Sequence, residues 1–258
     1  MLKTKMDIAK NWLPRYTGMP LDKFGDYIIL TNFRNYLERF AERYNCRIYG
    51  SNNPMQATTS SDGITMINFG MGSANTASIM DLLIAVDPKA VLFLGKCGGI
   101  KRSSEIGHFI LPIAAIRGEG TSNDYKPPEV PALPSFKMHK LISEKLHNQG
   151  LEYRTGVVYT TNRRVWEWDH KFKNYLRKLS AIAVDMETAT LFIVGHANKI
   201  PRGALLLVSD LPMTPEGVKT TENDLKTNKS YINLHLDIGI ESVIDLGKND
   251  EFIKHFKY

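Results

Sequence analysis

The sequence predicts a three-layer α/β/α fold with a central mixed, mostly parallel sheet. Short apolar runs bounded by glycine, proline or polar residues are typical of buried strands in such a sheet. Segments with helical periodicity lie between most of these runs, as in layered α/β proteins. The predicted strands are residues 27–30, 64–69, 90–94, 108–111, 155–159, 181–184 and 204–208. The predicted helices are residues 35–44, 73–85, 137–149, 165–179, 187–197 and 232–246.

We expect one catalytic domain over residues 1–258, with residues 1–24 as an N-terminal extension. A chain of 258 residues with 43% hydrophobic and 23% charged residues is long and apolar enough for one large core. Four prolines within 126–134 predict a rigid extended surface loop, with a domain linker as the alternative. The polar segment 213–229 predicts a mobile flap over a site, with a plain solvent loop as the alternative.

Composition and charge exclude several classes of protein. The net charge of +6 fits an anionic partner, although basic residues also keep a surface solvated. No zinc-finger spacing, aromatic-basic run or long basic tail indicates nucleic-acid binding. Cys46 and Cys97 have no metal-ligand spacing, so we predict no metal, no cofactor and no disulfide framework. Apolar runs such as 204–208 are too short to span a bilayer, and a cytoplasmic protein without a membrane partner is expected.

Two glycine-rich segments follow predicted strands. FGMGSANTA at 69–77 ends a strand and opens a helix, where glycines let a ligand approach and free N–H groups attract an anion. Asn75 replaces the third glycine of the dinucleotide-binding motif, so that function is set aside. LGKCGG at 94–99 places Lys96 and Cys97 among glycines. The two segments predict one crevice, and Cys97 is expected to be a buried packing residue rather than a nucleophile.

Two further segments place carboxylates at the ends of buried strands. VDMET at 184–188 places Asp185 and Glu187 at the strand end, where at most one of them can face the crevice without crowding from the other. Glu187 suits a cis-diol because an ionised carboxylate has two acceptor oxygens; a helix-start carboxylate is the alternative. Asp210 follows the most apolar run of the chain, where burial favours a proton donor near neutral pH. Capping of the following turn is its alternative role.

In this order and spacing, the four segments resemble the superfamily of purine nucleoside phosphorylases and uridine phosphorylases, which also contains nucleosidases. The similarity runs from about residue 25 to residue 210. Within the superfamily the chain resembles the catalytic domain of the AMP nucleosidase family, as a short form without the further N-terminal domain of larger relatives. The segments that carry this resemblance are 25–33, 94–99, 115–120, 127–131 and 160–168.

The resemblance implies a nucleoside phosphorylase fold and a hydrolase of purine salvage that cleaves the N-glycosidic bond of AMP to adenine and ribose 5-phosphate. Glu187 would hold the ribose hydroxyls, with Met186 and Met71 against the sugar. Asp210 would protonate the purine at N7 as the bond breaks, with Ser209 orienting it, so that it acts where charge develops in the transition state.

The base and the 5′-phosphate need groups of their own. Trp166 or Trp168 would stack on adenine, with packing in the core as the alternative. A phosphate dianion favours charge-assisted contacts. The candidates for these contacts are Arg34, Lys96, Arg163 and Arg164. The resemblance also implies a homohexamer built as a trimer of dimers, in which a neighbouring subunit lends a site residue.

The sequence departs from the family pattern at two places. Phe93 stands where phosphorylases present an arginine to inorganic phosphate, which favours water as the nucleophile, although Lys96 could still neutralise a phosphate. Related hydrolases place a glutamate near the end of the first strand, where this chain reads LTNF at 30–33. A positioned water without a base is one solution. The candidate bases are Glu119, Asp124 and Asp185.

Two other functions stay open at this stage. One is a purine nucleoside phosphorylase or nucleosidase that acts on unphosphorylated nucleosides. The other is a non-catalytic nucleotide-binding protein, against which the presence of both Glu187 and Asp210 argues.

Overall fold

The computed structural model describes residues 4–214, 217 and 221–248, with the backbone alone described for 221–230 and 248. The strands are β1 (Tyr27–Thr31), β2 (Gln56–Thr59), β3 (Ile64–Asn68), β4 (Ala90–Gly99), β5 (Phe109–Gly118), β6 (Tyr153–Thr161), β7 (Ala183–Asp185) and β8 (Arg202–Asp210). The α-helices are α1 (Lys5–Thr17), α2 (Arg34–Tyr44), α3 (Ser73–Leu82), α4 (Phe136–Asn148), α5 (His170–Lys178), α6 (Thr188–Ala197) and α7 (Thr221–Lys248). Short 3-10 turns are η1 (Leu21–Lys23), η2 (Leu83–Ala85) and η3 (Thr121–Asp124).

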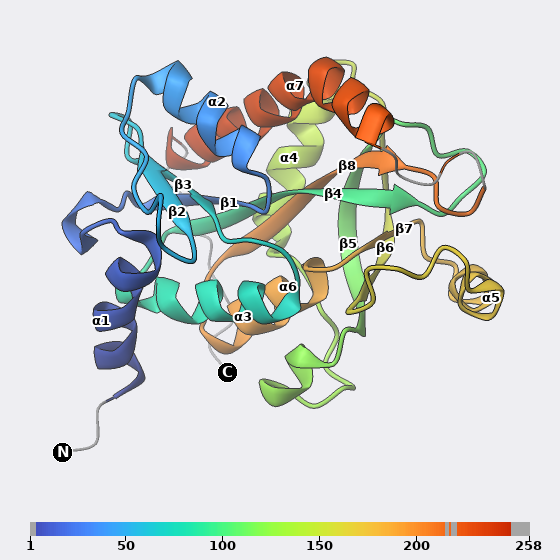
Figure 1. Ribbon diagram of the computed structural model, residues 1–258, viewed down its shortest axis with the longest axis horizontal. Helices are drawn as coiled ribbons and strands as arrows, with labels where there is room; N and C mark the ends of the chain where they lie inside the picture. Colours follow the sequence, from blue (N-terminus) through green and yellow to red (C-terminus); the bar gives the residue numbers. More distant parts are fainter. Residues whose placement is uncertain (1–3, 215–216, 218–220, 249–258) are drawn as a thin grey trace.

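The strands form one mixed sheet that partly closes on itself. Its order is β2-β3-β1-β4-β7-β6-β5-β8, and β4 also pairs with β8. This pairing joins β4, β7, β6, β5 and β8 into a ring, from which β1, β3 and β2 extend (Figure 1). The pairs β2–β3, β4–β7 and β5–β8 are antiparallel, and the others are parallel. The predicted mixed, mostly parallel sheet is confirmed.

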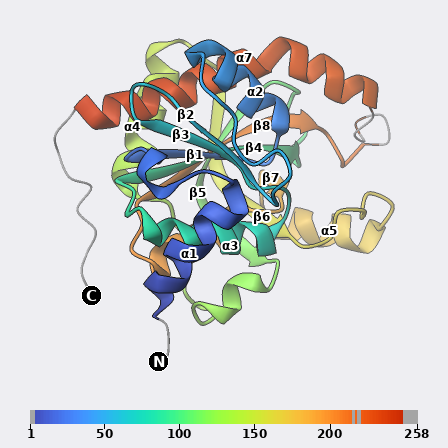
Figure 2. The ribbon, with the colours of Figure 1, turned by 60° about the vertical axis from the view of Figure 1, so that its left-hand side comes forward.

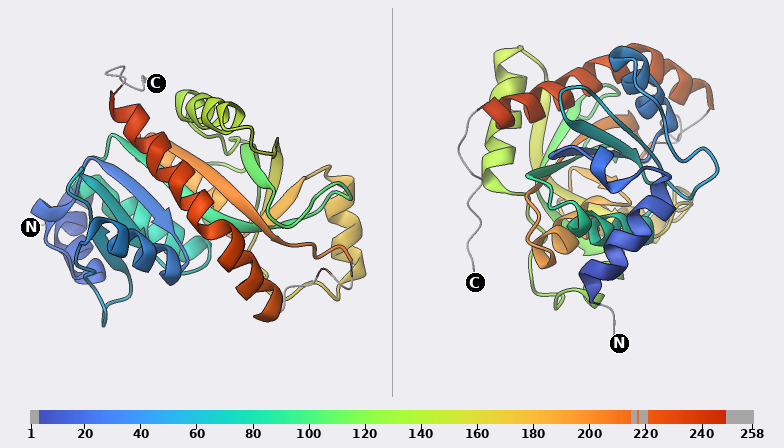
Figure 3. Two further views of the ribbon diagram at one scale, coloured as in Figure 1. Left: turned by 90° about the horizontal axis from the view of Figure 1, so that it is seen from above. Right: turned by 90° about the vertical axis from the view of Figure 1, so that its left-hand side faces the viewer.

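Helices cover both faces of the sheet (Figures 2 and 3). On one face α3 and α6 pack against strand residues such as Ile28 and Val91. On the other face α2, α4 and α7 pack against residues such as Ile29 and Leu92. Since successive strand residues point to opposite faces, a strand buried on both faces is apolar at every position. The predicted three-layer α/β/α architecture is confirmed.

Two elements form where the sequence predicted none. β2 is a short polar strand that pairs antiparallel with β3, so it has no apolar alternation to reveal it. α1 lies within the predicted N-terminal extension, where Thr4 and Asp7 make a capping box. It buries Ala9 and Leu13, and the Lys5 ammonium lies 2.6 Å from an Asp81 carboxylate oxygen. Charged residues interrupt the narrow apolar stripe of this helix, so the sequence pattern did not predict it.

The helix α7 begins at Thr221, earlier than the sequence pattern predicted. It therefore includes the end of the predicted flap, 213–229, as helix. Residues 215–216 and 218–220 lie outside the described residues. A flap over the site stays a prediction.

A buried histidine joins α7 to the sheet and to α2. His235 Nε2 lies 3.0 Å from the Leu205 carbonyl oxygen, and its Nδ1 lies 2.9 Å from the Tyr36 hydroxyl. Because a carbonyl only accepts, we assign the ring proton to Nε2, so that the Tyr36 hydroxyl donates to Nδ1. Burial lowers the pKa of His235 to about 3, and the ring is neutral. The pair therefore joins α2 to α7 and, through the Leu205 carbonyl, to β8.

The proline-rich segment 126–134 is organised by Arg117, the penultimate residue of β5. The Arg117 guanidinium donates to the carbonyl oxygens of Lys126, Pro127 and Val130. Ala132 then pairs with Ala115 in an antiparallel bridge. The predicted extended course holds only in part, because 127–130 form a turn in which the Val130 N–H donates to the Pro127 carbonyl oxygen at 3.1 Å. One arginine side chain satisfies several carbonyl oxygens of the segment.

Candidate active site

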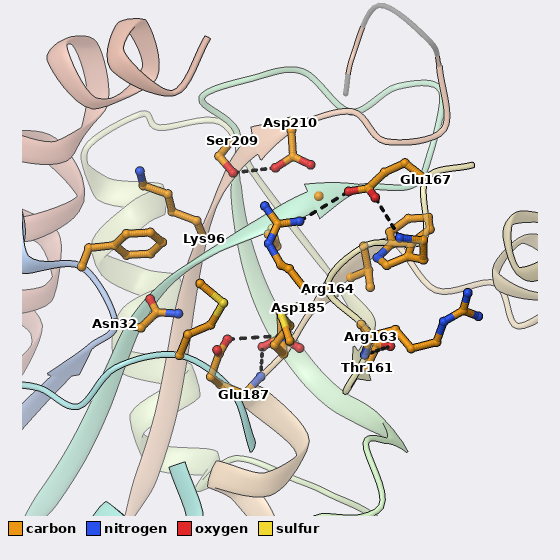
Figure 4. Close-up of a pocket in the computed structure, with 17 residues that line it drawn as sticks. Asn32, Lys96, Thr161, Arg163, Arg164, Glu167, Asp185, Glu187, Ser209 and Asp210 are labelled. Carbon is orange, nitrogen blue, oxygen red and sulfur yellow. Dashed lines mark hydrogen bonds and ion pairs between the residues drawn. The ribbon is translucent and has the colours of Figure 1, made fainter. Parts of the chain in front are cut away.

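An open pocket lies where β1, β4 and β8 end and α6 begins (Figure 4). Its empty volume of about 620 Å³ includes the open space at its mouth. Carboxylates, basic side chains and two methionines face it together. The lining residues are Asn32, Phe33, Met71, Lys96, Cys97, Gly98, Thr161, Arg163, Arg164, Trp166, Glu167, Val184, Asp185, Met186, Glu187, Ser209 and Asp210.

The end of β4 forms the floor of the pocket. The sequence predicted a strand over 90–94, but the strand continues to Gly99, because 95–99 pairs with β8 and β7. Glycine is required here by close approach: a Cβ at Gly98 would lie 2.8 Å from the Pro212 ring and 3.2 Å from Asp210 Oδ2. Gly98 is also the register partner of Asp210. The missing side chain therefore lets the Asp210 carboxylate lie against the floor.

Cys97 lies in the same strand and is buried. Burial raises the pKa of its thiol well above the ordinary value, and the nearby charges of Asp185 and Asp210 raise it further. The thiol is protonated at neutral pH. This state suits the expected packing role and not that of a nucleophile, which requires the thiolate.

The loop between β3 and α3 donates hydrogen bonds to the VDMET segment. The sequence had predicted that the N–H groups of this loop would be free to attract an anion. Gly72 adopts a φ of 94°, which favours glycine, and its N–H donates to Glu187 Oε1 at 2.7 Å. The Ser73 hydroxyl donates to the Met186 carbonyl oxygen at 2.7 Å. The first glycine-rich segment thus acts on the site through Glu187 and Met186.

Asp185 is the carboxylate that caps α6. Its Oδ2 accepts from the Glu187 and Thr188 N–H groups, at 3.2 and 2.7 Å, and from the Thr188 hydroxyl at 2.5 Å. Its Oδ1 accepts from the Thr160 hydroxyl at 2.7 Å. Burial raises the pKa of Asp185, and these hydrogen bonds oppose the rise. The helix-start role considered for Glu187 therefore belongs to Asp185.

Glu187 is buried at the base of the pocket, with 2% of its surface exposed. Burial raises the pKa of its carboxyl to about 8, and the charge of Asp185 adds to the rise. Hydrogen bonds from the Gly72 and Met186 N–H groups and from the Asn32 side chain oppose it. A carboxyl fixed on several sides, with two oxygens at the pocket, can receive two neighbouring hydroxyls of a ligand.

Asp210 lies at the other end of the pocket, at the end of β8. The Ser209 hydroxyl donates to Asp210 Oδ1 at 2.7 Å. Figure 4 shows the two carboxyl groups of Asp210 and Glu187 well apart, facing one open space. One ligand can therefore meet both, with different parts.

The two tryptophans of the 160–168 segment have different surroundings. Trp166 lines the pocket, is 4% exposed, and packs edge-on against Phe172 at a ring distance of 5.3 Å. Trp168 does not line the pocket and is 70% exposed. Of the two tryptophans, only Trp166 lies at the pocket with the other candidate residues.

The four candidate phosphate ligands are also divided by the structure. Lys96 lines the pocket, with its ammonium 4.3 Å from the centre of the Phe33 ring. Arg164 points into the pocket, 3.5 Å from Glu167 Oε1, whereas Arg163 turns outward to Asp169 at 3.0 Å (Figure 4). Arg34, on the first turn of α2, is not among the lining residues. It pairs instead with Glu38 at 2.7 Å.

Three carboxylates were candidates for a water-activating base. Glu119 is buried outside the pocket, where it accepts from the Ser122 N–H and the Thr190 hydroxyl. Asp124 lies in η3 and does not line the pocket. Asp185 lines the pocket but accepts four hydrogen bonds. Two of the three carboxylates thus lie outside the pocket, and the third is occupied by hydrogen bonds. These positions argue against each of them as the water-activating base.

Sequence reasoning did not select several residues that line the pocket. Asn32 was noted only because it is not a carboxylate, and Thr161 and Glu167 were not selected. Each lies within two positions of a selected residue, but a polar residue near a strand end is too common to identify a site. Among the described residues no group of three or more potential metal-ligating side chains occurs, and no helix there is long and apolar enough to cross a membrane.

The family follows from this fold and this site. The sheet closes through β4 and β8, and a pocket lined by carboxylates lies at its strand ends, as in an α/β enzyme with its site at the edge of the sheet. The family model of the phosphorylase superfamily matches residues 26–240, and the chain belongs to this superfamily.

Within the superfamily the chain belongs to the AMP nucleosidase family. A crystal structure of AMP nucleosidase from Bacteroides thetaiotaomicron is 55% identical, with a TM-score of 0.86 over 96% of this chain and 100% of that chain. AMP nucleosidase from Escherichia coli is 29% identical over 93% of this chain. This chain spans only 58% of the length of that relative. A uridine phosphorylase structure from Vibrio fischeri, 24% identical with a TM-score of 0.78 over 87% of this chain and 94% of that one, shares the fold.

Proposed function

We propose that this chain hydrolyses the N-glycosidic bond of AMP, giving adenine and ribose 5-phosphate. The observation that carries the proposal is that Glu187 and Asp210 face one pocket together with the basic residues Lys96 and Arg164. A nucleotide presents a diol, a basic ring and a dianion, and the pocket offers a complement to each. The 55% identical AMP nucleosidase supports the same substrate.

In this proposal Asp210 protonates N7 of adenine, so that the base leaves neutral as the C1′–N9 bond breaks. Ser209 orients the Asp210 carboxyl through its hydrogen bond. Glu187 accepts from the ribose 2′- and 3′-hydroxyls, and Met186 and Met71 pack on the sugar. These contacts strengthen as positive charge develops on the ribose. Contacts that are stronger in the transition state than in the bound substrate lower the activation barrier.

Trp166 provides a wall for adenine, since it lines the pocket and its ring is fixed by Phe172. Trp168 has no such place within this chain. Lys96 and Arg164 are the proposed ligands of the 5′-phosphate. Arg163 and Arg34 would need to leave Asp169 and Glu38 to join them.

Water is the proposed nucleophile. Phe93 occupies the position where phosphorylases present an arginine, and its ring lies fully buried against Phe69 at 5.8 Å. A buried aromatic ring offers no charge to inorganic phosphate. Phosphorolysis therefore lacks one of its usual anion ligands.

We also propose a homohexamer, built as a trimer of dimers, in the cytoplasm. The apolar side chains of Val165 and Trp168 beside the pocket are 72% and 70% exposed, as suits residues that a neighbouring subunit covers. Cys46 and Cys97 are both free thiols, which fits a reducing compartment.

A base-release assay tests the reaction. AMP, adenosine, IMP and GMP are each incubated with the enzyme, with and without inorganic phosphate, and the free base is measured. We expect adenine from AMP without phosphate, and much slower release from adenosine. A strict requirement for added phosphate would contradict hydrolysis, and equal turnover of adenosine would contradict a nucleotide substrate.

Replacing Arg164 with methionine tests the phosphate site. Charge-assisted hydrogen bonds contribute about 1.5–3 kcal/mol, so kcat/KM for AMP should fall by about 10- to 100-fold. The value for adenosine should change by less than about twofold, because adenosine has no phosphate to lose. Arg177→Met on the exposed face of α5 is the matched control. An equal loss with both substrates would show that Arg164 acts elsewhere than on the phosphate.

A further inference from the structure

Asn32 is a half-buried polar side chain of the pocket whose hydrogen bonding is incomplete. Its side chain makes a hydrogen bond that favours the ionised form of Glu187, so the amide N–H is the donor. Its carbonyl oxygen is buried and has no hydrogen-bond partner among the described residues. A buried acceptor without a partner costs roughly 1–3 kcal/mol. A donor that enters with the substrate would remove this cost.

The topology places Asn32 on the side of the pocket opposite Asp210. Asn32 directly follows β1, and Asp210 ends β8. β4 pairs with both strands, with Thr31 opposite Leu94 and Gly98 opposite Asp210. Two strand spacings, about 10 Å, therefore separate the two sides. Figure 4 shows the same separation, with Glu187 at the lower edge of the pocket.

This separation matches the two sides of the anomeric carbon. If Asp210 meets the base and Glu187 the diol, the ribose lies over the floor made by β4. The face of C1′ turned away from the base then looks toward Asn32. A nucleophile that displaces the base in line must approach from this face.

We propose that Asn32 is a further positioning residue of the reaction, whose side-chain oxygen accepts a hydrogen bond from the attacking water. This inference rests on the proposed hydrolysis of AMP. The water oxygen forms a bond to C1′ as the C1′–N9 bond breaks, and the electron pair of that bond stays with adenine. Asp210 gives its proton to N7. The surplus proton of the water passes to solvent, from which Asp210 is reprotonated.

A carboxamide orients a water without taking its proton. This is sufficient where the bond to the leaving base is largely broken before the new bond forms, because the sugar is then strongly electrophilic. The observed geometry agrees, since the carboxylates Glu119, Asp124 and Asp185 are either outside the pocket or occupied by other donors. The Asn32 amide is held in orientation by its own bond to Glu187.

Two substitutions separate the acceptor of Asn32 from its donor. Asn32→Leu removes both, and Asn32→Asp keeps an acceptor oxygen but loses the N–H. A misplaced reactant costs roughly 100-fold, so we expect Asn32→Leu to lower kcat for AMP by about this factor with KM within about threefold. Asn32→Asp should keep at least ten times more of kcat than Asn32→Leu. In both variants the ascending limb of the pH profile of kcat/KM should move to higher pH, because Glu187 loses a donor.

Asn68→Leu is the matched control, because Asn68 ends the neighbouring strand β3 and does not line the pocket. Equal kcat values for Asn32→Leu and Asn32→Asp, a rise in KM with unchanged kcat, or no effect at all would each overturn the proposal. Thermal unfolding of each variant separates these results from misfolding, and Asn32→Asp serves if the leucine variant does not fold. If the wild-type enzyme itself releases no adenine without phosphate, it is the proposed function that fails.

Discussion

Asp210→Asn lowers kcat for AMP by roughly a hundred- to ten-thousand-fold, the usual contribution of a general acid. Asparagine keeps the shape of the side chain but has no proton to give to N7. The Ser209 hydroxyl can still donate to the remaining carbonyl oxygen, so the position of the side chain is preserved. AMP binding should change little, because the lost interaction belongs to the transition state. Steady-state rates and equilibrium binding of AMP measure the two effects separately.

The exposed residue Asp22 supplies a control for this substitution, since Asp22→Asn removes a carboxylate far from the pocket. A substrate whose base leaves without protonation should recover much of the lost rate in Asp210→Asn. An unchanged kcat in that variant would remove Asp210 from the mechanism.

Glu187→Gln removes the pH dependence that a buried carboxyl imposes. The pKa of Glu187 is raised to about 8, chiefly by burial and then by the charge of Asp185. If the ionised form receives the ribose hydroxyls, kcat/KM of the wild-type enzyme rises with pH and levels off above about 8. Glu187→Gln should be slower by roughly a hundred-fold or more, and this ascending limb should be absent. Rates measured from pH 5 to pH 10 test both expectations.

The same carboxyl affects stability with a definite sign. Between the ordinary pKa of 4.5 and about 8 the folded state keeps a proton that the unfolded state has lost. The free energy of unfolding therefore falls as pH rises through this interval and is level above it. Each pKa unit is worth about 1.4 kcal/mol, so the loss relative to Glu187→Gln amounts to several kcal/mol. Parallel urea-unfolding curves for the two proteins over this range would contradict the raised pKa.

The predicted and observed positions of the polar residues differ for a physical reason. Asp210 and Glu187 could be selected from sequence because each follows a buried apolar run, and strand ends lie at one edge of a parallel sheet. Arg34 was selected as a basic residue for a phosphate dianion, and Trp168 as an aromatic residue of the segment 160–168 that could stack on adenine. Their side chains turn to Glu38 and to the surface. Arg34 thus pairs along its own helix, whereas the exposure of Trp168 depends on how the surrounding segments pack.

The glycine-rich run 95–99 shows the same limit. Its composition is typical of a turn, and the sequence contains no sign that β7 and β8 pair with it on both sides. The folded chain makes the small side chains necessary, because Pro212 approaches Gly98 and Leu211 approaches Gly99 too closely for a Cβ. The position of Asn32 is a further example. Only the pairing of β4 with both β1 and β8 places Asn32 across the floor of the pocket from Asp210.

The sequence by itself determined the layered α/β class, most of the strands, the superfamily and the two central carboxylates, because apolar periodicity and short motifs are local properties of the chain. The tertiary structure decided which carboxylate caps α6 and which lies buried below the pocket, since Asp185 takes the N–H groups of the helix start and Glu187 takes that of Gly72. It also decided which basic residues meet the pocket. The hydrogen bond that fixes Glu187 joins segments more than a hundred residues apart in the chain, and only the folded sheet brings those segments together.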